Sequence, residues 1–429
     1  LDFRASLWDG EKPFHVVDES GRPLSCFMRG VEFQRQLGHQ SIRDMRRAHV
    51  EMTVPDVPGL GWRVFYAQEG TAETARSAKI TVDGSHVTTP GLEIDLHDDG
   101  SIDLFEKASG RQYAGLNALR DVADRGDEYN FDAMPGDTMI APRPLVPWSV
   151  VSLSGDGATL ETTVSLTLPE ALAEDRMHRS EATLEVPVVI RLSVRVASTR
   201  IDFEARLTNT CKDHKLVALF PTGFQGDRVW VDETFGLFGK DVDTPNGEAV
   251  ADWKEKPLAQ CPVKGFVTVG NDSGGCAVLN EGLPEFESMR ADDRSVVIAQ
   301  TLFRAVGWLS RPDLFIRDHN GGVEVPAPEG QCLRDFVFRY AFMPFAGSRA
   351  EAGLYAAAAD FAVPGYVIPL RDRETDPDPL DPETKDRFVS RHATGPFPAV
   401  FGLAEVGGGN FAVSTVKRAE ESDAMILRI

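Results

Sequence analysis

The sequence has 429 residues, of which 42% are hydrophobic and 26% charged, a balance typical of a folded globular protein rather than a disordered or fibrous one. Its 66 acidic residues outnumber its 45 lysines and arginines, for a formal net charge of −21, and a field of that sign disfavours nucleic acid and anionic membranes as partners. No apolar run approaches the roughly 20 residues of a membrane span, so no membrane partner is expected.

A small β domain, incomplete at its start, is expected over residues 1–75. A strand passes through Trp62, Val64 and Phe65, and the composition then becomes small and polar between Gly70 and Ser85. This change in composition indicates a boundary near residue 75.

Residues 76–365 have the alternation of half-buried antiparallel strands. Apolar and polar residues alternate in four runs, at residues 92–96, 102–104, 190–196 and 201–207. The first two runs are joined through Asp99-Gly100, a pair that tolerates the positive φ angles of a tight hairpin turn. Period-2 alternation of this kind predicts an all-β, mainly antiparallel fold.

Helical periodicity is scarce, and the best candidate is the alanine-rich segment Ala350–Asp360. Residues 371–387 are charged and proline-rich, so we expect an exposed loop or linker there. A last β unit from about Pro396 completes a third region, residues 366–429, incomplete at its end.

Five cysteines (Cys26, Cys211, Cys261, Cys276 and Cys332) are scattered through the chain without metal-finger spacing. An odd, scattered set of this kind indicates free thiols in a reducing compartment, so a cytoplasmic location is expected.

Several blocks of the sequence resemble, in the same order, the C-terminal region of the glycoside hydrolase family 38 α-mannosidases. The blocks are DVPGLGWR at 56–63, DDGS at 98–101 with KASGR at 107–111, GDEYN at 126–130, KDHKL at 212–216 with FPTG at 220–223, LNEGLPE at 279–285, RAVGWLSRPDL at 304–314, QCL at 331–333, and STVKR at 414–418 with MILR at 425–428.

The resemblance implies a galactose-mutarotase-like supersandwich flanked by smaller β-sandwich domains. In the family, a separate N-terminal domain holds a catalytic zinc ion, and its motifs do not occur in this sequence. We therefore expect no catalytic residue, metal ligand or cofactor in this chain, and zinc in the missing catalytic domain. The expected partners are that domain and a mannose-containing carbohydrate, and a homo-oligomer is compatible with the sequence.

Two clusters are candidates for contact with the sugar cleft or the catalytic domain. By resemblance, Asp127, Glu128 and Tyr129 approach the active site, where a tyrosine hydroxyl can bond catalytic carboxylates. The alternative is an ordered surface loop packed on the sandwich.

The second cluster is Arg311, Asp313 and Arg317, which resembles a basic loop near the family's sugar cleft. A guanidinium fork suits carboxylates and vicinal hydroxyls. The alternative, a local ion-pair network, is slightly favoured.

Three histidine segments could suggest metal sites but have simpler interpretations. His97-Asp98-Asp99 is expected to form a turn, Asp213-His214 a solvated turn with a local hydrogen bond, and residues 319–322 a structural loop. The tryptophans could stack on sugars, but each is expected in the core.

Two further functions remain open from the residues alone. One is a stand-alone carbohydrate-binding module, and the other is a mutarotase-like epimerase that uses a histidine and a glutamate in the sandwich groove.

Overall fold

A computed structural model describes most of the chain. The described residues are 2–4, 14–24, 26–37, 42–52, 54, 56–71, 80–154, 156–234, 236–363, 365–367, 398–403, 413 and 415–428. The segment 371–387, for which a linker was predicted, lies outside them. The chain divides into two compact units, a sandwich unit (residues 79–151 and 158–363) and a smaller unit (residues 1–78, 152–157 and 364–429).

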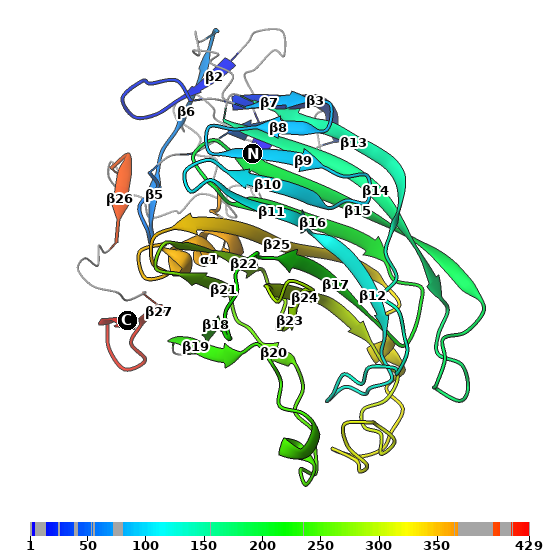
Figure 1. Ribbon diagram of the computed structural model, residues 1–429. Coiled ribbons are helices and arrows are strands. Elements are labelled where there is room, and N and C mark those ends of the chain that lie inside the picture. Colours follow the sequence, from blue (N-terminus) through cyan, green and yellow to red (C-terminus); the bar gives the residue numbers. More distant parts are fainter. Residues whose placement is uncertain are drawn as a thin grey trace. The chain divides into compact units, whose positions relative to one another are not determined.

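The sandwich unit is built from three antiparallel sheets (Figure 1). The first has five strands in the order β11-β10-β9-β8-β7. They are β7 (Thr81–Asp83), β8 (His86–Thr88), β9 (Leu92–Leu96), β10 (Ile102–Glu106) and β11 (Arg111–Leu116). The β9–β10 hairpin turns at Asp99-Gly100, which confirms the turn predicted from those residues.

The second sheet also has five strands, in the order β12-β17-β24-β23-β20, and it positions the candidate site. The strands are β12 (Ala118–Ala123), β17 (His214–Pro221), β20 (Gln260–Pro262), β23 (Glu285–Arg290) and β24 (Val296–Ala305).

The third sheet has nine strands in the order β13-β14-β15-β16-β25-β22-β21-β18-β19. They are β13 (Arg143–Leu153), β14 (Gly157–Pro169), β15 (Thr183–Arg195), β16 (Ile201–Thr208), β18 (Arg228–Glu233), β19 (Gly236–Asp241), β21 (Phe266–Asn271), β22 (Gly274–Asn280) and β25 (Asp335–Ala346). The two predicted runs at 190–196 and 201–207 pair as β15 and β16, with Ile190 opposite Ala205.

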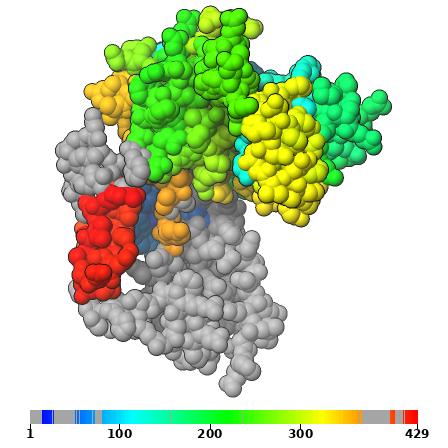
Figure 2. All heavy atoms as spheres, turned by 90° about the horizontal axis from the view of Figure 1, so that it is seen from below, coloured from blue at the N-terminus to red at the C-terminus, as the bar shows by residue number. Residues whose placement is uncertain are grey.

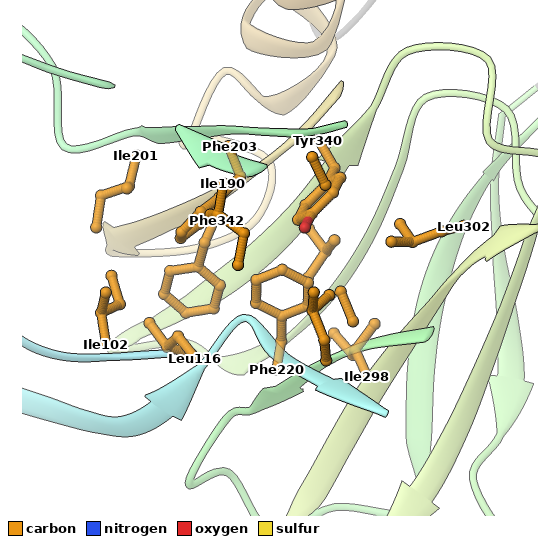
Figure 3. Close-up of a cluster of buried hydrophobic side chains, with 14 of the residues drawn as sticks. Ile102, Leu116, Ile190, Ile201, Phe203, Phe220, Ile298, Leu302, Tyr340 and Phe342 are labelled. Atoms are coloured by element: carbon orange, nitrogen blue, oxygen red, sulfur yellow. The ribbon is translucent and has the colours of Figure 1, made fainter. Parts of the chain in front are cut away.

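One large hydrophobic core joins the three sheets of the sandwich unit. It receives the apolar side chains of alternate strand positions, as period-2 patterning requires. Figure 3 shows its aromatic centre, where Phe203 stacks on Tyr340 with ring centroids 5.7 Å apart and Phe220 stacks on Phe342 at 5.9 Å. The all-β antiparallel prediction is confirmed.

A single α-helix of the described residues, α1 (Leu354–Ala362), packs on strands of the nine-stranded sheet. It begins four residues later than the predicted segment, because Gly353 precedes it with φ of 63°, outside helical geometry. Two short 3-10 turns complete the sandwich unit, η1 (Gly247–Val250) and η2 (Pro328–Gln331).

The smaller unit consists of four small sheets among its described residues. They pair β1 (Asp2–Arg4), β4 (Ile42–Met52) and β3 (Cys26–Leu37); β2 (Phe14–Val17) and β6 (Tyr66–Glu69); β5 (Gly61–Arg63) and β26 (Val400–Gly402); and β27 (Thr415–Arg418) and β28 (Met425–Arg428). Trp62 of β5 stacks on Phe401 of β26 at 4.3 Å, so segments from the two ends of the sequence form one element. The predicted boundaries near residues 75 and 365 stay predictions.

Candidate functional site

Two loops from the same edge of the second five-stranded sheet form the candidate site. Ala123 at the end of β12 lies opposite His214, and His214 lies opposite Ala305 at the end of β24. The loops that follow, residues 124–132 (the first site loop) and 306–322 (the second site loop), therefore leave the sheet side by side. The backbone N–H of Glu128 donates to the carbonyl of Trp308 at 3.0 Å and joins them.

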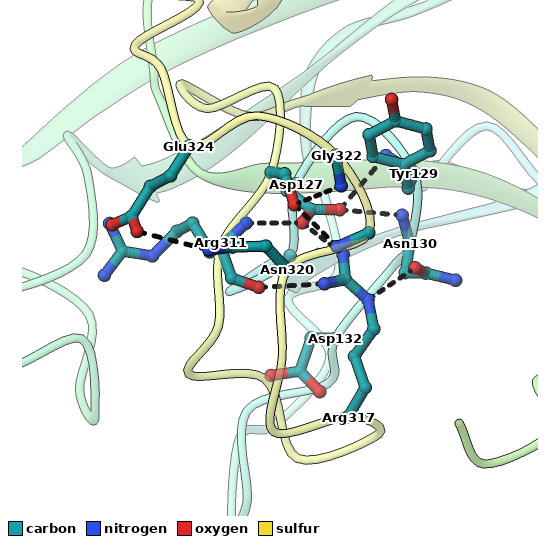
Figure 4. A network of polar contacts seen from close by, with 12 residues as sticks. Asp127, Tyr129, Asn130, Asp132, Arg311, Arg317, Asn320, Gly322 and Glu324 are labelled. Atoms are coloured by element: carbon teal, nitrogen blue, oxygen red, sulfur yellow. Dashed lines mark hydrogen bonds and ion pairs between the residues drawn. The ribbon is translucent and has the colours of Figure 1, made fainter. Parts of the chain in front are cut away.

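A buried ion pair between Asp127 and Arg317 fixes the two site loops to each other (Figure 4). Both side chains are completely buried. The second carboxylate oxygen, Oδ2, also accepts the backbone N–H of Arg311 at 2.8 Å. The first oxygen, Oδ1, accepts the N–H groups of Tyr129 and Asn130, each at 3.0 Å. A buried carboxylate with four donors is fully satisfied, so Asp127 organises the loops rather than offering a free acid.

The remaining donors of Arg317 are also used within the site. Its guanidinium donates to the carbonyls of Arg311 at 2.9 Å and His319 at 2.6 Å, and to the side-chain oxygen of Asn130 at 3.0 Å. The fixed fork of a guanidinium makes these bonds directional, so one side chain ties together several points of the second site loop.

Arg304 supports the first site loop from beneath. Its Nε donates to the buried Asp124 at 2.7 Å, and its terminal nitrogen donates to the carbonyls of Asp127 and Asn130 at 3.1 and 2.8 Å. Burial opposes the charge of Arg304, but the Asp124 carboxylate outweighs it and raises the pKa of the guanidinium.

A second buried pair, Arg125 with Asp132 at 2.8 Å, closes the other end of the first site loop. Arg125 also lies over the ring of Phe315 at 4.1 Å, and Asp132 accepts the N–H of Phe315. Burial raises the pKa of the Asp132 carboxyl, although this N–H and Arg125 oppose the shift.

Arg311 and Asp313 form a local ion pair, as in the alternative slightly favoured in the interpretation of the sequence. The guanidinium donates twice to the carboxylate, at 2.8 and 2.9 Å, and lies 4.9 Å from the Trp308 ring centroid. The hydrogen bonds from Arg311 lower the pKa of Asp313. Arg176 lies 3.5 Å from Asp313, and its pKa is lowered by burial and by the charge of Arg311.

Tyr129 is the most exposed aromatic group of the first site loop, with 54% of its surface accessible. Figure 4 shows its ring directed away from the Asp127 carboxylate. A Cβ at Gly322 would lie 2.5 Å from the Tyr129 hydroxyl oxygen, so glycine is needed for this close approach. The N–H groups of Gly321 and Gly322 donate to the buried hydroxyl of Ser310 at 2.9 and 3.1 Å, which holds the loop against the ring.

The two candidate clusters predicted from the sequence thus meet in one network. Arg317 of the second cluster forms an ion pair with Asp127 of the first, in addition to its bonds within its own loop. Glu128 and Tyr129, which follow Asp127 in the chain, are exposed. The residues around 310–330, yellow in Figure 2, form a continuous raised surface at this edge of the sandwich unit. Chemically, the exposed groups are the phenol of Tyr129 and the carboxylate of Glu128, on loops joined by the buried ion pair.

Sequence reasoning did not identify Asp124, Asp132 or Arg304 as members of the network. The only local signal was the density of acidic residues around Asp127. Their arginine partners lie on β24 or within the same loop, and a chain separation of 180 residues between Asp124 and Arg304 leaves no sequence pattern.

The prediction that His214 lies in a solvated turn is wrong. Its ring is buried, with Nδ1 2.5 Å from Asp121 and Nε2 3.0 Å from the side-chain oxygen of Asn209. Asp121 is also bonded by Arg179 at 2.6 Å. The register of β12 and β17 places these groups inside the protein, whereas Asp213 does adopt the turn conformation, with φ of 54°.

The prediction that each tryptophan lies in the core is wrong for two of the five that the structure describes, whereas Trp148 packs against the large core. Trp62 and Trp253 are exposed, and Trp148, Trp230 and Trp308 are half-buried. Trp148 donates its indole N–H to the carbonyl of His97 at 2.8 Å, which shows why a partly polar ring stays near the surface.

Within the described ranges, no three histidine, cysteine, aspartate or glutamate side chains are grouped as a metal ion would require. The zinc implied by the resemblance therefore has no fitting ligand set among these residues. The same residues contain no helix that is long and apolar enough to cross a bilayer.

Comparisons with known proteins place this chain among the relatives of glycoside hydrolase family 38. No family profile matches the chain. A protein of Halalkalibacterium halodurans named "Putative mannosylglycerate hydrolase" is 24% identical over 353 residues, which cover 79% of this chain and 35% of that protein.

Two solved structures share the fold. A glycosyl hydrolase family 38 protein from Enterococcus faecalis gives a TM-score of 0.77 at 18% identity, over 97% of this chain and 46% of its own. An α-mannosidase from Enterococcus faecalis V583 gives 0.75 at 19% identity, over 100% of this chain and 47% of its own. The predicted resemblance is confirmed, and the chain spans less than half the length of each of these proteins.

Proposed function

We propose that this family 38-related chain is the non-catalytic β portion of a zinc-dependent retaining α-mannosidase. In this role the sandwich unit packs on the catalytic domain, and the two site loops line part of the sugar cleft. The zinc ion and the catalytic carboxylates belong to the catalytic domain, and the natural substrate is a mannose-containing carbohydrate.

One observation carries the proposal: two loops far apart in sequence are joined by a buried ion pair and present Tyr129 outward. Buried charges are costly unless they are fully bonded, and this cost is typical of loops that must keep a defined geometry. The surface around them is also rich in exposed apolar groups, namely Trp253, Phe315 and Val323. Such groups are expected where a second surface is covered.

Tyr129 is assigned the role of a positioning or sugar-contacting residue at the edge of the cleft. Its hydroxyl can donate to a carboxylate or accept from a sugar hydroxyl. Arg311 stands beside it but is neutralised by Asp313, so its contribution is to shape the loop rather than to supply a free positive charge.

The test uses the protein at its natural length, with 4-nitrophenyl α-mannoside and mannosylglycerate as substrates. Tyr129→Phe removes only the hydroxyl, and the expected result is a fall in kcat/KM of about tenfold, the value of one hydrogen bond to a charged group. Tyr355→Phe, on helix α1, is the matched control and should leave both constants unchanged. Equal effects of the two variants would remove Tyr129 from the cleft.

A second variant moves the ring without removing it. Gly322→Ala places a methyl group against the Tyr129 hydroxyl, so the exposed ring must swing away. We expect kcat/KM to fall as in Tyr129→Phe while the melting temperature stays nearly constant. The 429-residue chain alone, purified and loaded with zinc, should not hydrolyse either substrate, and measurable hydrolysis by it would contradict the proposal.

A further inference from the structure

A cavity of about 230 Å³ lies on the second five-stranded sheet, apart from the exposed face of the site loops. Leu216 and Ala218 of β17 point into the core, so their neighbours Lys215 and Val217 point to the opposite face, where the cavity is. The segment that follows β12 lines it through Phe131, Ala133, Met134, Asp137 and Met139.

One wall of the cavity holds a buried ammonium group. The side chain of Lys215 is only 1% exposed, with its Nζ 4.4 Å from the Phe131 ring centroid. The carboxylates of Glu285 and Glu287 lie 3.3 and 3.5 Å from Nζ. Within the part of the chain that the structure describes, however, the ammonium has no hydrogen-bond acceptor in suitable geometry.

The carboxylates of Glu285 and Glu287 already accept hydrogen bonds from other donors. Glu285 accepts the hydroxyl of Thr301 at 2.9 Å, and Glu287 accepts the side-chain amide of Gln260 at 2.6 Å. An ammonium carries three N–H donors, and a buried donor without an acceptor is costly. This unmatched group indicates a ligand that brings an oxygen atom to Lys215.

The rest of the cavity wall is mostly apolar and contains three methionines, Met134, Met139 and Met289. The remaining charged wall residue, Asp137, accepts two bonds from Arg179 and one from the N–H of Ala123, so it is already satisfied. Methionine side chains adapt to irregular apolar shapes and contact aromatic rings well.

We propose that this cavity binds a small uncharged alcohol or phenol, with its hydroxyl group at Lys215 and Glu287 and its ring against Phe131 and the methionines. The hydroxyl oxygen accepts from the ammonium, and its proton is donated to the Glu287 carboxylate. This single hydroxyl group supplies the hydrogen-bond acceptor that the Lys215 ammonium lacks among the described residues.

Size and charge exclude the main alternatives. A cavity of about 150 Å³ lined by apolar groups holds benzene, so this larger one admits a six-membered ring with one or two further heavy atoms. One lysine between two glutamates leaves a net negative charge, which disfavours anions. A sugar would place several hydroxyls against methionine and valine side chains, where they have no partners.

The experiment compares benzyl alcohol with toluene, which has the same ring and no hydroxyl. The full 429-residue chain carries methyl-labelled methionine, and the methyl resonances of Met134, Met139 and Met289 are followed by NMR during titration. We expect both ligands to shift these signals, with benzyl alcohol binding at least about tenfold more tightly, as hydrogen bonds to charged groups predict. Methyl α-mannoside should leave the signals in place.

Lys215→Met tests the source of this preference, because it keeps the apolar stem and removes the ammonium. We expect the preference for benzyl alcohol over toluene to disappear. Ala133→Phe, at an exposed position on the cavity wall, should abolish binding of both ligands while preserving the fold.

Three results would overturn the proposal. They are equal affinities for the alcohol and the hydrocarbon in the unmodified chain, tighter binding of the mannoside, and unchanged ligand binding in Ala133→Phe. The last variant keeps the test decisive if Lys215→Met does not fold.

Discussion

Replacing Asp127 by asparagine tests whether the buried ion pair holds the site loops together. The amide keeps an oxygen for the N–H groups of Tyr129 and Asn130, but it directs an NH₂ group at two donors, the backbone of Arg311 and the guanidinium of Arg317. Each lost hydrogen bond to a charged group is worth about 1.5–3 kcal/mol. The two bonds together amount to about 3–6 kcal/mol, and removal of one partner of a buried pair typically costs about 3–5 kcal/mol, so we expect a loss of about 4 kcal/mol.

Hydrogen exchange measures this loss where it occurs, which matters because a chain of two units need not unfold in one step. If the loops open locally, about 4 kcal/mol corresponds to exchange about a thousandfold faster in peptides from residues 126–132 and 308–322. Asp313→Asn is the matched control, since its carboxylate pairs with Arg311 at the surface and is worth about 0–1 kcal/mol. Similar exchange in the two variants would refute the assignment of the loop closure to Asp127.

A double replacement separates the cost of an unpaired charge from the value of the pair itself. Asp127→Leu with Arg317→Met removes both charges, and apolar replacements of buried pairs are often neutral or stabilising. We expect the free energy of unfolding to recover only in part, because backbone groups of both loops lose their partners, and residues 308–322 to exchange rapidly because the bonds from Arg317 to the loop carbonyls are gone.

Three further predictions concern other parts of the sandwich unit. His214→Gln removes a ring bonded to the buried Asp121, so urea denaturation should show a loss of about 2 kcal/mol. The pKa of Asp313 is lowered in the folded protein, so its contribution to stability is present above its ordinary pKa of about 4 and is lost as the pH falls below it. The difference in urea midpoint between Asp313→Asn and the unmodified chain should therefore shrink from pH 6 to pH 3. Gly100→Ala combines a φ of 85° with a Cβ clash and should cost about 2–4 kcal/mol in thermal unfolding, against about 1 kcal/mol for Gly84→Ala, which has a φ of 58° and open space.

Local features of the sequence predicted the strands and their nearest pairings. The alternation at 92–104 and 190–207 sets which side chains are buried, and the short turns between the runs leave antiparallel pairing as the available geometry. No comparable sequence pattern predicts which other strands lie beside each hairpin in its sheet. β16 lies beside β25, with Phe203 opposite Tyr340, because both contribute aromatic rings to one core, and that match is a property of the packed interior.

In the candidate site, too, the sequence identified residues of each loop but not the pairing between the loops. The resemblance singled out residues of both site loops, but as two separate clusters. Their connection depends on Ala123, His214 and Ala305 lying in register across three strands. The 190 residues between Asp127 and Arg317 hide this pairing from any reading of local pattern.

The His214 error has a specific physical cause. Asp and His after a strand are typical of a solvated turn, and Asp213 does turn the chain. The next residue, however, is already the first of β17, where alternation points its side chain inward. A buried imidazole then needs a partner for each nitrogen, and Asp121 and Asn209 supply them from one neighbouring strand and one preceding loop.

The cost of the buried network argues for a role beyond stability. Apolar side chains of similar size would avoid the desolvation of two charges, but they would leave the backbone N–H groups and carbonyls of the two loops without these partners. What apolar packing cannot supply is direction: four donors converge on Asp127, and Arg317 reaches three separate acceptors besides it. These directional bonds hold the backbone of Tyr129 through its N–H group, and under the proposed function they present the exposed hydroxyl to the catalytic domain.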